Sequence, residues 1–348
     1  MEQEKWKIEI ARERDKKEIE TIMHPLIREW FFSRFTDFSL PQLYGVMPIW
    51  ERRNILISAP TGGTKTLTAF LSILNYLVTL AEKQELEDKV YAVYISPLKA
   101  LNNDVAKNLI EPLQEINEIA NKKGVKLQKI RVSVRTGDTT VSDRQKMLKN
   151  PPHIIISTPE TCAILLNTVK FIELLKACEF VIIDEIHALA NKRGVHLSIS
   201  IERLENISKI IPTRVGLSAT IAPLEEIAKF LTGNRDCLIA DVKFSKKMDI
   251  QVVTPSDLIE SSAYEMHQSM YKKIDELIQE HKTTVIFTNT RSATERVIHH
   301  LKEMFPARYL ENIGAHHSSL SKEHRFNIEE RLRKGELKVV VKIGRAHV

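Results

Sequence analysis

Short apolar runs alternate along the chain with longer stretches of helical periodicity. The most marked run is Phe180–Ile183, which is followed at once by Asp184, Glu185 and His187. A continuous apolar run of this length is typical of a strand buried on both faces, and the alternation predicts an α/β fold with a doubly wound parallel sheet. Further strands are predicted at Ile55–Ile57, Val90–Ser96, Ile130–Val134, Ile154–Ser157 and Val215–Ser218.

The acidic pair after the Phe180–Ile183 strand is a candidate for chemistry. In open parallel sheets, ligands bind beyond the carboxyl ends of the strands, so Asp184 and Glu185 should face a ligand. Asp184 could hold magnesium, and Glu185 could orient and deprotonate a water that attacks phosphorus. Taken alone, the pair fits a solvated acidic turn equally well.

A phosphate-binding loop favours the chemical interpretation. The strand Ile55–Ile57 enters a turn rich in proline and glycine, and the turn ends in Lys65-Thr66 before an apolar-periodic helix, Leu67–Leu80. Backbone N–H groups at such a turn can cradle phosphates. Lys65 would reach the β- and γ-phosphates, and the Thr66 hydroxyl would bind magnesium. The nucleotide-binding residues predicted here are Pro60, Thr61, Gly62, Gly63, Thr64, Lys65 and Thr66.

Ala59–Thr66 resembles motif I, and Asp184–His187 resembles the DExH form of motif II, of superfamily-two helicases, in particular the Lhr-like (large helicase-related) group. The resemblance implies RecA-like P-loop lobes that use ATP and Mg²⁺, with Lys65 and Glu185 catalytic and Thr66 and Asp184 at the metal. The family has glycine where this chain has Thr64. Glycine allows conformations that would cost a β-branched residue about 1–3 kcal/mol.

Gln42, upstream of the phosphate loop, resembles the glutamine that recognises adenine in this family. A carboxamide carries a donor and an acceptor side by side, which matches the amino group of adenine and its neighbouring ring nitrogen. The position of Gln42 therefore favours ATP over GTP.

Three predicted strand ends carry loops that resemble nucleic-acid-binding motifs: Ile95–Asn102, Arg135–Asp138 and Ser157–Glu160. Such groups contact the sugar-phosphate backbone without reading sequence. Each loop also reads as a helix N-cap. The candidates, with those of two similar segments nearer the C-terminus, are Pro97, Lys99, Asn102, Thr136, Gly137, Thr158, Pro159, Asn289, Thr290, Arg291, His316 and His317.

Leu217–Thr220 resembles motif III, and the resemblance implies that Ser218 and Thr220 couple His187 to the nucleic-acid-binding loops. The segment Lys192–Leu197 after the DExH motif is also similar to the Lhr-like group and narrows the family.

The chain has 348 residues, which suits two domains. We expect a charged helix or tail over 1–23, a first RecA-like lobe over 24–241, and a linker with a second, truncated lobe over 242–348. The second lobe is predicted to contain a strand at Ile250–Val253, a helix over Tyr264–His281 and strands at Thr284–Phe287 and Leu337–Val341.

The family's motifs V and VI do not follow the Leu337–Val341 strand. Residues 342–348 are expected to be artefactual, since Ile343–Val348 resembles a reading frame of a common sequencing adapter.

The net charge of +6 and the pI near 9.0 favour a polyanionic partner without requiring one. Cys162, Cys178 and Cys237 lack the spacing of a zinc site and are expected to be buried thiols, with no structural metal. No apolar run approaches the roughly 20 residues that span a membrane, and the charged N-terminus lacks the core of a signal peptide. We therefore expect a cytoplasmic protein without a membrane partner, and we favour a monomer.

These features predict an ATP-dependent helicase or translocase on DNA or RNA, slow or inactive as this fragment. The resemblance suggests a role in DNA repair or RNA handling. One alternative is a catalytically degenerate nucleic-acid-binding protein, in which Thr64 and the short C-terminus are genuine. A less favoured alternative is a protein-translocating ATPase, which shares the two-lobe core. Because nucleic-acid binding releases counterions, the response of ATP turnover to salt separates these classes.

Overall fold

The computed structural model describes residues 6–60, 64–97, 99–189, 191–220, 222–243, 249–254, 262–317 and 319–344. The predicted phosphate-binding residues Thr61, Gly62 and Gly63 lie outside this part, as do the side chains of Lys99 and Asn102. The chain forms two compact units, Met1–Lys246 and Lys247–Val348, and each is described by itself.

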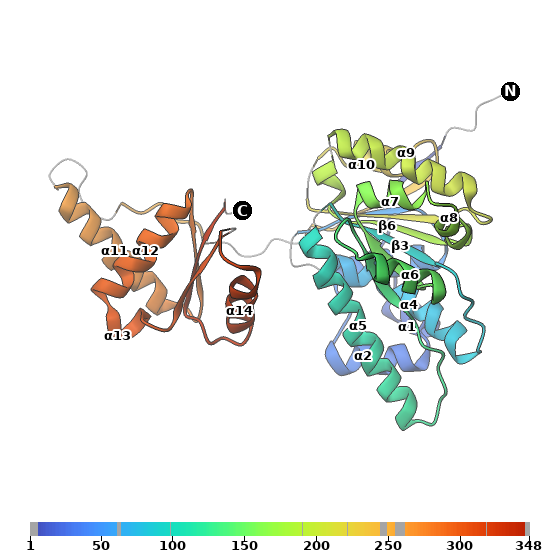
Figure 1. Cartoon of the computed structure of the whole chain (residues 1–348), viewed down its shortest axis with the longest axis horizontal. Helices are drawn as coiled ribbons and strands as arrows, with labels where there is room; N and C mark the ends of the chain where they lie inside the picture. Colours follow the sequence, from blue (N-terminus) through green and yellow to red (C-terminus); the bar gives the residue numbers. More distant parts are fainter. Residues whose placement is uncertain are drawn as a thin grey trace. The chain divides into compact units, whose positions relative to one another are not determined.

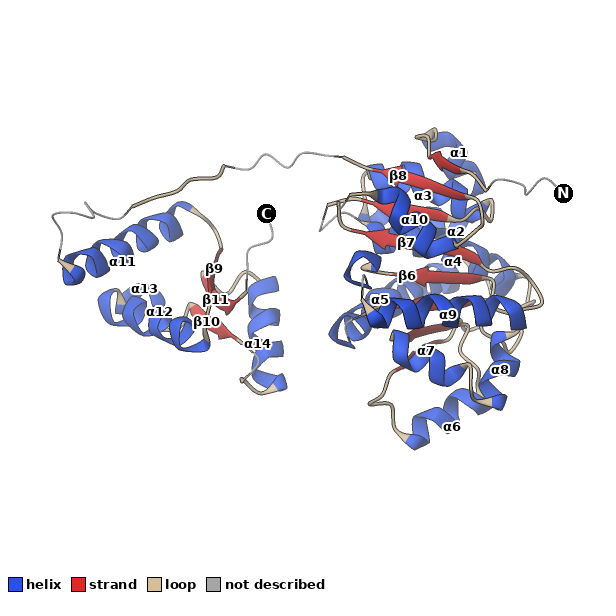
Figure 2. Cartoon of the chain, turned by 90° about the horizontal axis from the view of Figure 1, so that it is seen from above, coloured by secondary structure: helices blue, strands red, loops and turns tan. Residues whose placement is uncertain are grey.

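The first unit is built on an eight-stranded sheet in the order β1-β8-β2-β7-β6-β3-β5-β4, with every neighbouring pair parallel. Figure 2 shows β8, β7 and β6 following one another across this unit. The sheet confirms the predicted parallel α/β architecture. The strands are β1 (Ile8–Ile10), β2 (Ile55–Ser58), β3 (Ala92–Ile95), β4 (Val132–Arg135), β5 (Ile154–Ser157), β6 (Phe180–Ile183), β7 (Thr213–Ser218) and β8 (Cys237–Asp241).

Helices cover both faces of this sheet, because successive strand residues point to opposite sides. Ile55 and Ile57 pack in one buried cluster and Leu56 in the other. In Figure 1, α9 and α10 lie on one side and α2 and α5 on the other. The first face carries α1 (Lys16–Ile22), α2 (Pro25–Arg34), α3 (Leu40–Trp50), α4 (Lys65–Glu82) and α5 (Lys99–Lys122); the second carries α6 (Val141–Lys149), α7 (Pro159–Leu165), α8 (Val169–Leu175), η1 (Ile186–Leu189), α9 (Lys192–Ile207) and α10 (Leu224–Thr232).

The N-terminal segment contains the expected helix as α1 and, before it, a strand that the charged composition did not predict. Strand β1 pairs with β8, and the Ala11 N–H donates to the Ile239 carbonyl at 2.8 Å. Helix α1 buries Ile19 completely. An edge strand needs partners only on one side and can leave its side chains in solvent, as Ile10 does, so a charged segment can still join a sheet.

The second unit has a three-stranded parallel sheet in the order β10-β11-β9. The predicted strand at Ile250–Val253 is wrong: residues 249–254 form neither strand nor helix, and Val252 is 98% exposed. An apolar run without a partner strand has no ladder to join. The elements are α11 (Ala263–Glu280), β9 (Thr284–Thr288), α12 (Arg291–Met304), α13 (Pro306–Tyr309), β10 (Ile313–His316), α14 (Lys322–Arg333) and β11 (Val339–Ile343).

The three cysteines are buried and free, as expected, and burial raises the pKa of each thiol to about 12. Among the described residues, no helix is both long and apolar enough to cross a membrane.

Candidate nucleotide site and nucleic-acid loops

Three neighbouring strands bring the predicted ATPase motifs to one edge of the sheet. Strand β7 lies between β2, which leads into the phosphate loop, and β6, which ends at Asp184. Ser58 pairs with Ser218, and the Ala59 N–H donates to the Ser218 carbonyl at 3.2 Å. Because all three strands are parallel, their carboxyl ends place motifs I, III and II side by side.

Lys65 occupies the first turn of α4 with its ammonium turned back onto the phosphate loop. Its Nζ donates to the carbonyls of Ala59 at 2.7 Å and Pro60 at 3.0 Å, and the residue is 6% exposed. Neutral carbonyls stabilise the buried ammonium less than an anion would. The ammonium is therefore held against the carbonyls that follow β2.

The two predicted metal ligands meet at a residue that the sequence did not single out. The Tyr94 hydroxyl, from β3, donates to Asp184 Oδ2 and also hydrogen-bonds the Thr66 side chain. Burial, and then the charge of Asp184, raise the pKa of Tyr94, so the phenol keeps its proton. A tyrosine in a buried strand looks like core, and only the folded arrangement reveals this contact. The hydroxyl of Thr66 and the carboxylate of Asp184 are oxygen donors of the kind that Mg²⁺ accepts, so the residues fit a magnesium site.

Glu185 lies beside Asp184 in a left-handed backbone conformation, with φ of 49°. Its pKa is raised, first by burial and then by the charge of Asp184, while His187 and Lys65 oppose the shift. Glu185 Oε2 lies 3.1 Å from Nε2 of His187. A raised pKa makes the carboxylate a stronger base, which suits the deprotonation of a water.

His187 connects Glu185 to motif III. Its Nδ1 accepts from the Ala219 N–H at 3.2 Å and lies 3.4 Å from the Ser218 hydroxyl. Because Nδ1 accepts, the ring proton is assigned to Nε2, where it faces Glu185. The predicted partner Thr220 is exposed, so the backbone of Ala219 makes the contact that was assigned to the Thr220 side chain.

Gln42 lies in the first turn of α3 and is 1% exposed. Its Oε1 accepts from the Ser39 N–H at 2.8 Å, whereas its buried Nε2 has no partner among the residues that the structure describes. Buried amide donors are nearly always paired, with protein, water or a ligand. The predicted adenine contact fits this orphaned donor.

Thr64 adopts φ of −59° and ψ of 31° at the N-cap of α4, and its hydroxyl hydrogen-bonds that of Ser39. A residue with negative φ does not need glycine. Thr64 therefore does not adopt the left-handed conformation for which glycine would be needed.

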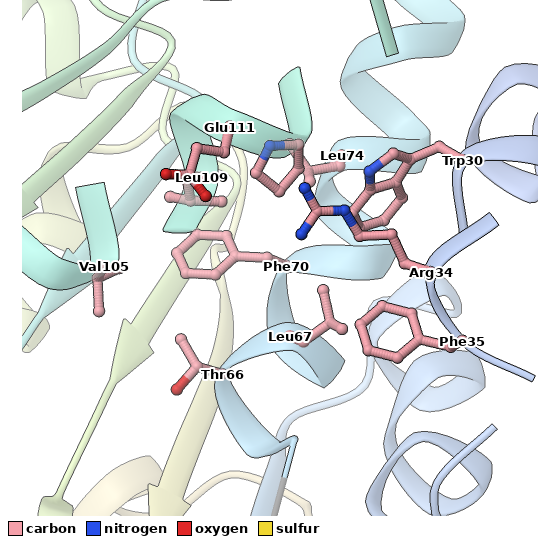
Figure 3. Close-up of a pocket in the computed structure, with 11 residues that line it drawn as sticks. Trp30, Arg34, Phe35, Thr66, Leu67, Phe70, Leu74, Val105, Leu109 and Glu111 are labelled. Carbon is pink, nitrogen blue, oxygen red and sulfur yellow. The ribbon is translucent and has the colours of Figure 1, made fainter. Parts of the chain in front are cut away.

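Beside Thr66, on the side of α4 that faces α2 and α5, lies a cavity of about 230 Å³. Figure 3 shows Trp30, Phe35 and Phe70 around it, with Thr66 at one end and Glu111 at the other. This mostly apolar cavity is lined by Thr66, one of the predicted nucleotide-binding residues, but by neither Lys65 nor Glu185.

The predicted nucleic-acid loops of the first unit follow β3, β4 and β5, which are neighbours in the sheet. The Ser96 N–H donates to the Ser157 carbonyl at 3.1 Å, and the Ser157 hydroxyl donates to the Arg135 carbonyl at 2.8 Å. The three loops therefore form one continuous edge. Pro97, Thr136, Thr158 and Pro159 are buried, and Gly137 is exposed.

Two of the predicted contact residues act as helix caps. Thr158 accepts from the Thr161 N–H at 3.4 Å at the start of α7, and Thr290 accepts from the Ala293 N–H at 3.1 Å at the start of α12. The N-cap alternative given for the Ser157–Glu160 loop therefore describes Thr158, and Thr290 has the same role although no cap was predicted there. Asn289, Thr290 and Arg291 are exposed.

The two neighbouring histidines of the second unit, His316 and His317, both contact carboxylates. His316 Nε2 lies 2.8 Å from a carboxylate oxygen of Glu329, and His317 Nε2 lies 2.7 Å from one of Glu295. His317 is only 8% exposed, so its side chain is not open to a nucleic-acid backbone. The sequence missed these contacts because both glutamates lie on helices distant along the chain.

Comparison with known proteins agrees with this geometry. The family description "DEAD/DEAH box helicase" matches residues 40–230, and "Helicase conserved C-terminal domain" matches residues 269–345. The chain belongs to the DEAD/DEAH box helicase family.

Its relatives narrow the class to the Lhr-like helicases. The chain is 51% identical to the ATP-dependent helicase Lhr-Core of Methanocaldococcus jannaschii, over 95% of this chain and 39% of the relative. It is 53% identical to Lhr-Core of Methanothermobacter thermautotrophicus, over 93% of this chain and 38% of the relative. A structure of the Mycobacterium smegmatis helicase Lhr bound to ssDNA and AMP-PNP matches 92% of this chain and 41% of that one, with 35% identity and a TM-score of 0.76. The chain thus spans about two fifths of these relatives.

Proposed function

We propose that this chain is the ATP-binding core of a helicase or translocase that hydrolyses ATP to move along or unwind DNA or RNA. The observation that carries the proposal is the meeting of Lys65, Asp184 and Glu185 at the ends of neighbouring strands, with His187 bonded to motif III. The relatives are ATP-dependent helicases by name, and one is described with ssDNA and an ATP analogue bound.

In this proposal, each site residue has a defined task. Gln42 Nε2 donates to the adenine, and Lys65 Nζ leaves the loop carbonyls to bind the β- and γ-phosphates. Glu185 orients a water in line with the γ-phosphate and takes its proton, and His187 holds the Glu185 carboxylate. Thr66 and Asp184 would hold Mg²⁺, which supplies neutralisation of phosphate charge.

His187 gives this site a physical link to motif III. A change in the Glu185 carboxylate alters its contact with Nε2 of His187, and the same ring accepts from the Ala219 N–H. We propose that the response passes along β7 and β3 to the loops that hold the nucleic-acid backbone. Nucleic acid would then regulate turnover through the same contacts.

The test is ATP turnover by this chain with and without single-stranded oligothymidylate or oligouridylate, across a range of salt concentrations. We expect slow turnover that rises with oligonucleotide and falls steeply as salt increases, because phosphate contacts release counterions. The two oligonucleotides separate DNA from RNA. The proposal would be contradicted by turnover that neither oligonucleotide changes, or by turnover that responds to an unfolded polypeptide without salt dependence.

A further inference from the structure

The segment Lys192–Leu197 contains none of the residues of the predicted nucleotide site, although only residues 188–191 separate it from the DExH motif. It forms the first turns of α9. Its Arg193 makes two bonds to different loops: Nη2 donates to the Pro97 carbonyl at 2.9 Å, and Nε donates to Glu160 Oε1 at 2.5 Å. Pro97 follows β3 and Glu160 opens α7 after β5, so one guanidinium joins two of the predicted nucleic-acid loops.

We propose that Arg193 is a positioning residue that holds these two loops in register for the nucleic-acid backbone and links them to the DExH segment. This inference rests on the proposed function. Arg193 acts through Pro97 and Glu160, and its planar guanidinium suits the task because its donors are fixed relative to one another.

The backbone of Arg193 is connected to the DExH segment by hydrogen bonds at the N-cap of α9. The Arg193 N–H donates to Asn191 Oδ1 at 2.9 Å, and Asn191 Nδ2 donates to the Ala188 carbonyl at 3.0 Å. The Ala188 N–H in turn donates to the Glu185 carbonyl at 2.8 Å. A short hydrogen-bonded path therefore leads from the predicted catalytic base to the guanidinium.

The surroundings of Gly194 show how closely the first turn of α9 packs against η1. A Cβ at Gly194 would lie 1.8 Å from the Leu189 carbonyl oxygen and 3.1 Å from the Phe230 ring. The start of α9 is thus pressed against η1, and a displacement of η1 would be transmitted to Arg193.

The negative charge of Glu160 allows an experiment to distinguish a positioning role from a purely electrostatic one. A carboxylate beside a phosphate track repels the polyanion unless a cation offsets it. If Glu160 affected binding only through its charge, its neutralisation would strengthen nucleic-acid binding. If Glu160 anchors Arg193, its neutralisation releases the Pro97 loop and weakens binding. The two accounts predict opposite signs.

The experiment compares Arg193→Ala, Arg193→Lys and Glu160→Gln with the wild type in the affinity for a labelled single-stranded oligothymidylate, with oligouridylate in parallel. We expect Arg193→Ala to weaken binding about tenfold, a size typical of coupling between sites, and Glu160→Gln to weaken it in the same direction. Arg193→Lys should recover only part of the affinity lost in Arg193→Ala, since an ammonium cannot reproduce the two directed hydrogen bonds. Affinity for ATP alone should stay the same.

Two matched controls carry the same charge changes elsewhere. Arg203→Ala removes an arginine of the same helix, whose Nη2 donates to the Leu166 carbonyl and to Asn167 Oδ1. Glu173→Gln removes an exposed carboxylate paired with Lys176. Both control variants should bind the oligonucleotide with the affinity expected from the change in net charge alone, or more tightly. If Glu160→Gln binds as tightly as Glu173→Gln, or more tightly, the positioning role is wrong.

Amide hydrogen exchange gives a readout that needs no nucleic acid. Exchange at the Ser96 and Thr161 amides should be faster in Arg193→Ala and Glu160→Gln than in the controls, because both loops lose their shared anchor. Unchanged exchange at these amides would overturn the inference. Faster exchange in a protein that binds neither oligonucleotide would show that Arg193 joins the two loops, but would reject the proposed function and a role of the joined loops in nucleic-acid binding.

Discussion

Replacement of Glu185 by glutamine is expected to lower ATP turnover by about 10²–10⁴-fold, the usual contribution of a general base. Glutamine keeps the shape of the side chain and can still contact His187, but it cannot accept a proton from water. ATP affinity should change little, because Lys65 and Gln42 make the proposed contacts to the nucleotide. Turnover and calorimetric ATP binding, measured on the same preparation, separate the two effects.

The pH dependence of the wild type provides a second check on Glu185. The base acts only when ionised, so turnover should fall as the pH decreases through the Glu185 pKa. Because burial and Asp184 raise that pKa, the fall should occur at a higher pH than for an ordinary glutamate. Glu173→Gln, which removes an exposed carboxylate, should leave both rate and pH profile unchanged. Wild-type turnover in Glu185→Gln would exclude Glu185 as the base.

Replacement of Gly194 by alanine is expected to destabilise the first unit by about 2–3 kcal/mol, toward the upper end of typical overpacking costs. Alanine within a helix is normally favoured over glycine by roughly 0.5–1 kcal/mol. Here the added Cβ would lie 1.8 Å from a backbone oxygen of Leu189, which cannot move aside as a flexible side chain could. The clash should therefore outweigh the gain in helix propensity.

Tryptophan fluorescence during urea unfolding measures this change in one unit alone, since Trp6, Trp30 and Trp50 all lie in the first unit. Val195→Ala is the matched control: it changes the next residue of α9, which is 61% exposed, and should alter the unfolding free energy by less than about 0.5 kcal/mol. A Gly194→Ala protein as stable as the Val195→Ala protein would mean that α9 and η1 are not closely packed.

Features encoded by local patterns were predictable from the sequence. The run Phe180–Ile183 and the run Ile154–Ser157 are strands with the predicted bounds, because both are central strands with apolar groups on two faces. The phosphate loop and the DExH motif predicted which strand ends would meet, because parallel strands share one functional edge.

Features that depend on distant contacts were not predictable. β1 is an edge strand whose charged neighbours hid its pairing with β8, and Ile250–Val253 looked like a strand but has no partner. Tyr94 looked like core, although its hydroxyl contacts Asp184. The cap role of Thr158 and the burial of His317 likewise depend on neighbours that a linear pattern does not identify.

Calorimetric titration of the chain with ATP and Mg²⁺, in the wild type and in Lys65→Ala, tests the nucleotide site most directly. We expect the wild type to bind ATP more tightly than GTP, because a carboxamide oxygen at Gln42 can accept from the amino group of adenine, where guanine has a carbonyl. Lys65→Ala should weaken ATP binding about 10–100-fold, the range expected when one hydrogen bond to a charged group is lost. Equal affinity in both proteins, or no binding by the wild type, would contradict an ATP site at the ends of β2 and β6.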